Sequence, residues 1–292
     1  MSTAEALWLG ILQGLTEFLP VSSSGHLVLA REWLGRGEAS GLVFEVLLHV
    51  ATVLAIVVFF RRRIAELLRG LLAGRPDAWR YAAKLVVATL PAVVVGGFFR
   101  HAIEEAFASP TFAAAGLIVT GCLLFTTRTS LARAQKPEPD FRAALLIGIA
   151  QAFAILPGIS RSGTTVVVAL ALGVAPMAAA EFSFLLGVIA ISGAAVLVLP
   201  DLATGVAIPW MALAVGFAAA AFAGLVALRS FVWLLKRRAF YAFAYYDWAV
   251  GGGCLLFTTR TSLARAQKPE PDFRAALLIG IAQAFAILPG IS

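Results

Sequence analysis

Residues 182–199 read FSFLLGVIAISGAAVLVL, an almost unbroken apolar run that decides the fold class. Its length is close to the ~20 residues that an α-helix needs to cross a lipid bilayer. A strand of a membrane β-barrel would alternate apolar and polar residues, whereas this run is apolar on every side. We therefore expect a membrane-spanning α-helix here.

The remainder of the chain has the same character. Of its 292 residues, 61% are hydrophobic and 13% are charged, and the mean hydropathy is +0.92. A soluble domain has roughly 45–50% apolar and about 25% charged residues, so a soluble globular fold is excluded. We expect an all-α polytopic membrane protein with six transmembrane helices, at about 43–60, 81–99, 112–127, 182–199, 209–228 and 239–257.

The net charge of +7 is concentrated in alternate connections between these runs. Arginine and lysine crowd the first connection (61–80), the third (128–142) and the fifth (236–238), whereas the connections around 100–110 and 200–208 are poor in both. Basic loops lie on the cytoplasmic side of membrane proteins, so the N-terminal region is expected outside. This distribution explains the basic charge without a nucleic-acid partner.

The last forty residues are a literal copy. Residues 253–292 repeat residues 121–160 letter for letter, and the copy stops in the middle of a motif. Structural repeats keep a pattern while their letters diverge, and they number three or more. We expect one membrane domain at 1–252, followed by a non-native tail from an assembly or recent duplication.

Two further apolar regions, at about 6–34 and 141–180, are each interrupted by a proline and a polar turn. Such breaks are tolerated at membrane depth only inside protein or against a wet cavity, so each region is predicted to be a re-entrant helical hairpin. Written at an offset of 138, the regions match without a gap, and Gly10, Gln13 and Gly25 fall on Gly148, Gln151 and Gly163. Three spans separate them, which predicts an inverted-topology repeat of about 1–60 and 139–199.

The first break reads QGLTEFLPVSSSGH, from Gln13 to His26. Gln13 and Glu17 share one helical face, where amide and carboxylate oxygens suit a hard cation. The next helix starts with hydroxyl and small residues, and free N–H groups at a helix N-terminus bind anions. His26 could transfer a proton or attack phosphorus. The predicted anion-binding residues of this break are Ser22, Ser23, Ser24 and Gly25.

The second break, LPGISRSGTT at 156–165, repeats the design with Arg161 in the place of Ser23. Arginine presents a fork of donors that suits phosphate, and inside a membrane it needs an anionic partner or water. Glu17 or a bound phosphate could be that partner. The predicted anion-binding residues here are Ser160, Ser162, Gly163 and Thr165. Three other embedded groups, Glu45, His49 and Glu181, either line the cavity or brace the hairpins.

These motifs, together with FEVLLHVATVLA and AAEFSFLLGV, resemble the undecaprenyl-diphosphate phosphatase family, also called the bacitracin-resistance family, over about residues 1–250. The resemblance implies hydrolysis of undecaprenyl diphosphate to the monophosphate and inorganic phosphate, which recycles the lipid carrier of peptidoglycan synthesis. It also implies a bacterial inner-membrane location, a site open to the outer face, and a divalent cation, Mg²⁺ or Ca²⁺. Gln13 stands where many members have glutamate.

On this resemblance we expect Arg161 to clamp the phosphoryl oxygens and Glu17, with Gln13, to hold the cation or orient the nucleophile. Either Ser23 or His26 attacks phosphorus, and Ser23 with His26 as proton carrier is favoured. The main alternative is a polyprenyl-phosphate flippase, because inverted repeats with broken helices also build transporters. A phosphatidic-acid-type lipid phosphatase is disfavoured because its flanking motifs are missing. A homodimer is also possible.

Overall fold

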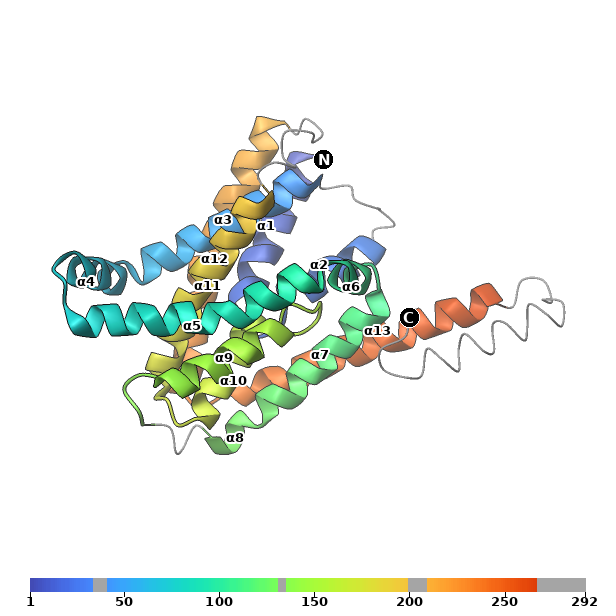
Figure 1. Ribbon diagram of the computed structural model, residues 1–292. Helices are drawn as coiled ribbons and strands as arrows, with labels where there is room; N and C mark the ends of the chain where they lie inside the picture. Colours follow the sequence, from blue (N-terminus) through green and yellow to red (C-terminus); the bar gives the residue numbers. More distant parts are fainter. Residues whose placement is uncertain (34–40, 131–134, 199–208, 267–292) are drawn as a thin grey trace. The chain divides into compact units, whose positions relative to one another are not determined.

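The structure is a computed structural model that describes the backbone of residues 1–33, 41–130, 135–198 and 209–266 (Figure 1). Contacts divide the chain into two units, Met1–Cys254 and Leu255–Ser292. In the described ranges every regular element is helical, apart from one isolated bridge between Lys136 and Val174. The helices are α1 (Thr3–Phe18), α2 (Ser23–Trp33), α3 (Gly41–Phe59), α4 (Arg61–Leu72), α5 (Pro76–Phe98), α6 (Arg100–Phe107), α7 (Pro110–Phe125), α8 (Thr127–Ser130), α9 (Phe141–Phe153), α10 (Arg161–Ala171), α11 (Pro176–Val198), α12 (Trp210–Lys236) and α13 (Phe243–Ala266).

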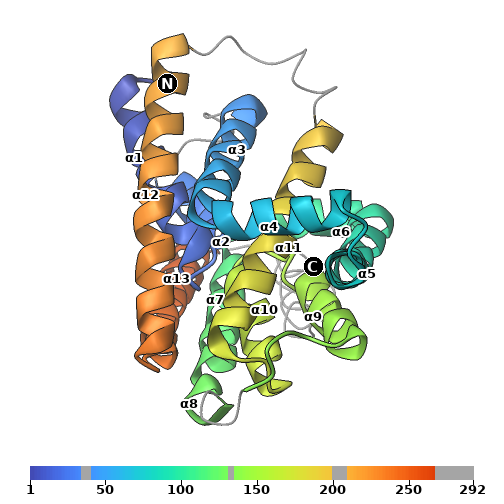
Figure 2. The ribbon, with the colours of Figure 1, turned by 90° about the vertical axis from the view of Figure 1, so that its left-hand side faces the viewer.

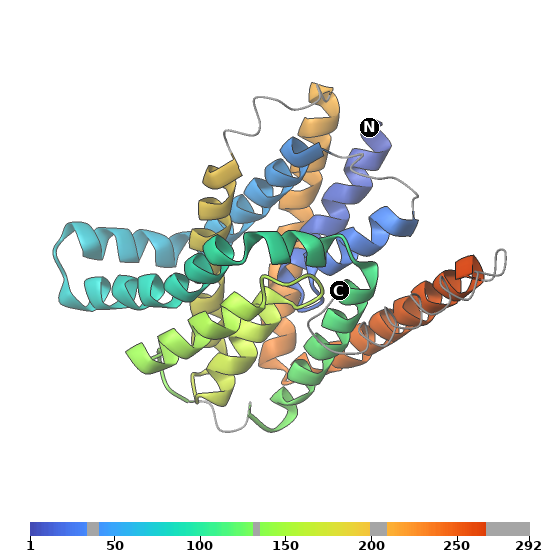
Figure 3. The same cartoon turned by 45° about the vertical axis from the view of Figure 1, so that its right-hand side comes forward.

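Four stretches are long and apolar enough to cross a membrane: α5, α7 with α8, α11 and α12. If α3 and α4, which meet at 80°, are counted as one bent span, there are five. α5 then runs alongside α4 (Figure 3). The chain is thus a multi-pass α-helical membrane protein, as predicted. All six predicted regions are largely helical. The number of six spans stays a prediction, because neither α3 by itself nor α13 is among the stretches that qualify.

Both predicted breaks are present. α1 ends at Phe18 and α2 starts at Ser23, whereas α9 ends at Phe153 and α10 starts at Arg161. Even the helix starts correspond at the offset of 138. The Ser2 side chain caps α1 by accepting from Glu5 N–H, and Asp140 caps α9 by accepting from Ala143 N–H. Both caps satisfy backbone donors that a helix N-terminus leaves free.

Each broken helix packs on a long helix from the other half of the chain. α1 lies along α12 (Figure 2), where a Cβ on Gly10 would collide with the carbonyl oxygen of Gly216. α9 lies along α5, where a Cβ on Gly148 would collide with the carbonyl oxygen of Ala88. Glycine permits this close backbone approach between membrane helices. The broken helix of each half thus packs on a long helix of the other half, as expected for two related halves.

The tips of the two breaks lie against each other. A methyl group on Gly25 would sit 2.9 Å from Gly158 Cα, and one on Gly163 would sit 3.0 Å from Pro20 Cβ. These two contacts are equivalent, because 25 and 163, like 20 and 158, differ by 138. The repeat therefore brings the starts of α2 and α10 together at one place in the first unit.

Candidate active site

A cavity of about 390 Å³ lies beside the two breaks. Its apolar wall comes mainly from the second break and from α11, and its polar residues come from the two breaks, the helices that flank them, and α3. This composition suits a polar ligand held inside an apolar membrane domain. The polar residues that line the cavity are Thr16, Glu17, Ser22, Ser23, Ser24, Glu45, His49, Gln151, Ser160 and Arg161.

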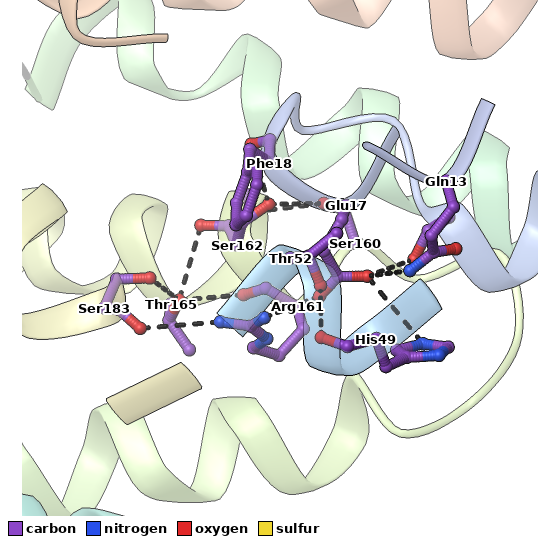
Figure 4. A network of polar contacts seen from close by, with 12 residues as sticks. Gln13, Glu17, Phe18, His49, Thr52, Ser160, Arg161, Ser162, Thr165 and Ser183 are labelled. Atoms are coloured by element: carbon purple, nitrogen blue, oxygen red, sulfur yellow. Dashed lines mark hydrogen bonds and ion pairs between the residues drawn. The ribbon is translucent and has the colours of Figure 1, made fainter. Parts of the chain in front are cut away.

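An ion pair joins the two halves of the chain in this cavity. Arg161 Nη2 lies 2.8 Å from Glu17 Oε1, and the two side chains are only 15% and 8% exposed (Figure 4). An arginine buried at this depth needs an anionic partner, and Glu17 is that partner, as the sequence suggested. The guanidinium has five N–H donors, so this contact leaves others available for a ligand.

Space for the guanidinium is provided by a glycine of α11. A Cβ at Gly187 would collide with Arg161 Nη1, so any larger residue there would displace the arginine. Gly187 corresponds to His49 at the offset of 138. Sequence reasoning missed this residue, although the offset alone could have identified it.

The other carboxylate oxygen of Glu17 collects two donors. Ser23 Oγ donates to Glu17 Oε2 at 2.7 Å. Gln13 Nε2 donates to the same oxygen at 3.1 Å, a contact that Figure 4 shows. Short bonds from a hydroxyl to a carboxylate are charge-assisted and strong. The arrangement places a hydroxyl directly beside a carboxylate, which is the pairing that a hydroxyl nucleophile and its base need.

His49 and Glu45 line the cavity, which resolves one of the alternatives that the sequence left open. His49 Nε2 lies 4.0 Å from Glu17 Oε2, and its Nδ1 lies 2.8 Å from the Glu45 carbonyl oxygen. Because that carbonyl can only accept, Nδ1 carries the proton and Nε2 faces the carboxylate. Glu181 instead braces the structure, since it accepts from Arg63 at 2.7 Å and from Tyr81 at 3.3 Å outside the cavity.

His26 does not lie where its predicted role as proton carrier requires. Its Nδ1 is 2.8 Å from the Ser22 carbonyl oxygen and its Nε2 is 2.8 Å from the Tyr246 hydroxyl, with the two rings stacked at 5.7 Å. It is not among the residues that line the cavity, and neither nitrogen contacts Ser23. Ser22 has a positive φ of 63°, a conformation that non-glycine residues adopt at a cost. His26 therefore holds the backbone of the first break.

The predicted anion-binding residues divide into three groups. Ser22, Ser23, Ser24 and Ser160 line the cavity, and their binding of an anion stays a prediction. Gly25 and Gly163 instead accept the close approach of the opposite break and donate their N–H groups to Ser22 Oγ and Ser160 Oγ. The remaining two predicted residues do not line the cavity. Ser162 Oγ donates to the Phe18 carbonyl, and the Thr165 hydroxyl is hydrogen-bonded to the Ser183 hydroxyl.

Thr120 of α7 anchors the second break and was not identified from the sequence. Its hydroxyl donates to the Gly158 carbonyl at 2.8 Å and accepts from Ser160 N–H at 3.0 Å. Because Thr120 is buried, these bonds satisfy two backbone groups that would otherwise lack partners away from water. Only the tertiary contact between α7 and the break shows this role.

A divalent cation is implied by the family resemblance, and the donors near Glu17 fit one in part. Gln13 Oε1 is buried without a hydrogen-bond partner, and oxygen donors are what Mg²⁺ and Ca²⁺ prefer. Among the described residues, however, there is no group of three or more aspartate, glutamate, histidine or cysteine side chains that could hold a metal ion. A cation here would therefore need ligand oxygens from the substrate as well.

Comparison with known proteins gives a consistent result. The family model for the bacitracin resistance protein BacA matches residues 6–253. Three relatives named undecaprenyl-diphosphatase come from Syntrophotalea carbinolica (39% identical over 86% of this chain and 97% of the relative), Salinibacter ruber (40%, over 86% and 98%) and Geobacter sulfurreducens (40%, over 88% and 98%). The matches cover nearly the whole length of these relatives.

Proposed function

This chain belongs to the bacitracin resistance protein BacA family, and from that premise we propose that it hydrolyses undecaprenyl diphosphate to undecaprenyl phosphate and inorganic phosphate. The observation that carries the proposal is the contact of Ser23 Oγ with a carboxylate that is itself paired with Arg161. A nucleophilic hydroxyl, a carboxylate base and a guanidinium that can bind phosphate thus meet in one cavity.

In the proposed reaction, Ser23 Oγ attacks the terminal phosphorus while Glu17 takes its proton. The phosphoanhydride bond breaks, undecaprenyl phosphate leaves, and a phosphoserine forms. Water, deprotonated by His49 Nε2, then attacks this phosphoserine. The bond between phosphorus and Ser23 Oγ breaks, Glu17 returns its proton to Ser23 Oγ, and inorganic phosphate leaves. Arg161 neutralises the charge that develops on the phosphoryl oxygens, a contribution that is commonly the largest in phosphoryl transfer.

Two helix starts support the same binding mode. α2 begins at Ser23 and α10 begins at Arg161, and both residues line the cavity. The N-terminus of a helix carries a partial positive charge and unpaired N–H groups, which favour a bound phosphate. Two such starts side by side suit the two phosphates of a diphosphate.

We also propose that a divalent cation assists, held by Glu17 and the unpartnered Gln13 Oε1. Bound there, a cation would supply charge neutralisation on the diphosphate. The proposal requires Gln13→Ala to weaken stimulation by Mg²⁺ or Ca²⁺, measured as the cation concentration that gives half-maximal phosphate release.

The test of the function is phosphate release from undecaprenyl diphosphate by the purified protein in detergent, with and without EDTA. Release that Ser23→Ala abolishes, in a protein with an unchanged melting temperature, supports the proposal. A folded protein that binds the lipid but releases no phosphate contradicts it and favours the flippase. Release that persists in EDTA contradicts the cation.

For the cellular location, we propose the bacterial inner membrane with the cavity open to the outer face; a homodimer also remains a prediction. The basic connections support this orientation. Ala195 lines the cavity, so a cysteine placed there in a Cys122→Ser background reports the orientation. A membrane-impermeant thiol reagent applied to intact cells with a permeable outer envelope should label it. Labelling only after the inner membrane is opened contradicts the proposal.

We propose that the duplicated tail has no part in this function. The family match stops at residue 253, and the first structural unit stops at Cys254, next to the start of the copy. A chain ended at Gly252 should therefore release phosphate at the same rate as the full chain. A rate more than tenfold lower in the short chain contradicts this.

A further inference from the structure

An apolar groove of about 690 Å³ runs between α5, α6 and α9, next to the polar cavity. Its lining consists of alanine, valine, leucine, isoleucine, phenylalanine and proline, with no polar side chain. Leu90, Val94 and Phe153 of this lining are between 52% and 65% exposed, so little else in the first unit covers them. Figure 1 shows the three helices that form it.

Helix packing explains where the groove starts. α5 and α9 touch closely at Ala88 and Gly148, which leaves no space between them at that point. The groove lies beyond this contact, at Leu90 and Pro91. Pro91 lies inside α5 where the groove begins, and a proline inside a helix removes one backbone hydrogen bond.

The groove and the polar cavity share one wall residue, Ile155 in the second break. On one side of it the cavity is lined by Ala92 and Ala154, and on the other side the groove is lined by Pro91 and Leu156. A ligand with a charged head and an apolar chain could therefore occupy both spaces at once by passing Ile155.

The internal repeat explains why Ile155 stands there. At the offset of 138, Ile155 corresponds to Glu17, so the same place in the two breaks carries a carboxylate in one and an aliphatic side chain in the other. The carboxylate serves the polar head of a ligand. An aliphatic residue is required where an apolar chain passes, because an unpaired charge there would be buried at high cost.

We propose that this groove holds the first isoprene units of the lipid whose diphosphate lies in the cavity. The inference rests on the proposed function and adds a chain-recognition site to it. Lipid is as apolar as the groove, so burial from water contributes little there, and recognition comes from the packing of a branched chain against shaped walls. The groove therefore acts on substrate discrimination rather than on the chemical step.

The test uses two bulky substitutions in the groove and one matched control on the same helix. Val94→Trp and Ala102→Trp fill the groove from α5 and α6, respectively. Val93→Trp places the same side chain on the neighbouring residue, which is 62% exposed and does not line the groove. Each variant is assayed with undecaprenyl diphosphate, farnesyl diphosphate and isopentenyl diphosphate, which carries a single isoprene unit, in one detergent.

The expected result is a fall of at least tenfold in the kcat/KM ratio of undecaprenyl or farnesyl diphosphate to isopentenyl diphosphate for both groove variants, with no change for Val93→Trp. A tenfold change is about 1.4 kcal/mol, within what shape recognition of an apolar chain provides. If kcat/KM falls equally for long and short substrates, or does not fall at all, the ratio is unchanged and the inference is overturned. Hydrolysis by the wild type would still support the proposed function.

A wild-type protein that hydrolyses no substrate would contradict the proposed function separately. The groove is then judged by retention of radiolabelled undecaprenyl diphosphate on the purified protein. Retention that falls in Val94→Trp and Ala102→Trp but not in Val93→Trp supports the groove, and equal retention overturns it. Phospholipid in excess is a further competitor. If it displaces the radiolabelled lipid as effectively as unlabelled undecaprenyl diphosphate does, the groove binds ordinary acyl chains and the inference is overturned.

Discussion

The two broken regions share one backbone plan but carry different chemistry. In both, a serine at the start of the second helix accepts the N–H of a glycine three residues on and lies 3.2–3.3 Å from a second serine, as the pairs Ser22 with Ser24 and Ser160 with Ser162 show. At the reactive positions they differ. Glu17 corresponds to Ile155, Ser23 to Arg161, and His49 to Gly187.

The difference teaches how a repeated fold becomes an asymmetric site. Residues that hold the breaks open and together are kept in both copies, because both copies need the same turns and contacts. The acid, the hydroxyl and the histidine come from the first copy, and the guanidinium with its space comes from the second. Neither half contains a complete site, so catalysis depends on their close contact.

The largest expected effect comes from removing the link between the copies. Arg161→Ala should lower kcat for phosphate release by a factor of about 10² to 10³ or more, as loss of a charge-stabilising donor does. It should also destabilise the fold by roughly 3–5 kcal/mol, because Glu17 is left buried without its partner. The measurements are phosphate release and thermal unfolding in detergent.

The double variant Arg161→Ala with Glu17→Gln separates these two effects. It removes the unpaired charge, so the melting temperature should recover while activity stays low. An active Arg161→Ala protein would show that the second copy contributes structure alone. Arg161→Lys keeps the charge but loses the fork of donors, so its kcat should lie between those of the wild type and Arg161→Ala.

A smaller effect is expected at Gly187, the counterpart of His49. Gly187→Ala adds a Cβ that collides with the Arg161 guanidinium, so kcat should fall by about tenfold to a hundredfold, a range typical of a misplaced catalytic group. Gly193→Ala on the same helix meets nothing within 4 Å and is the matched control. Equal activity of the two variants would show that Arg161 has room to move.

His26 tests whether the first break needs support that the second lacks. His26→Asn can still donate from its amide to the Ser22 carbonyl, so we expect activity within about tenfold of the wild type, a difference of about 1.4 kcal/mol. His26→Ala should lose more, because the Ser22 carbonyl, next to the positive φ, then keeps only its bond from the backbone N–H of residue 26. A proton carrier would instead make both variants equally inactive and change the pH profile of kcat.

The smallest effect is expected at the helix caps, Ser2 and Asp140. The Ala143 N–H and then Lys136 hold the pKa of Asp140 below its ordinary value. Because the pKa is lowered on folding, the cap's charge-dependent stabilisation is present at neutral pH and is lost as the pH falls through the folded-state pKa. Asp140→Ala should lower the melting temperature slightly at pH 7, and Asp140→Ser, the residue that caps α1, should recover the part that comes from the uncharged hydrogen bond. A pH-independent difference between wild type and Asp140→Ser would show that the charge has no role.

Much of the site could be predicted from the sequence because the relevant signals are local. The prolines and serines of each motif specify a break in a helix, and an arginine inside a membrane domain needs an anion. These local signals are sufficient to indicate Glu17, Ser23 and Arg161. The contact of His26 with Tyr246 could not be predicted, because a motif gives the order of residues but not the direction of a side chain, and Tyr246 lies 220 residues away.

Identical residues in two places show the limit of local signals most directly. In the original stretch, which begins at residue 121, α7 ends at Phe125, Thr126 caps it, and the short helix α8 follows. In the duplicated tail, which begins at residue 253, the same amino acids continue without interruption to Ala266 as part of α13. Local propensity is the same in both, so the surrounding contacts decide whether the helix stops.

The sequence by itself determined the apolar helical class, the two breaks, the repeat at 138 and the residue types of the site, because hydropathy, periodicity and turn chemistry are written in neighbouring residues. Only the tertiary structure decided that Gly187 makes room for Arg161, that His49 rather than His26 faces the carboxylate, and that Ile155 separates a polar cavity from an apolar groove. These facts depend on contacts between helices far apart in the chain, and such contacts are set by packing of the whole domain.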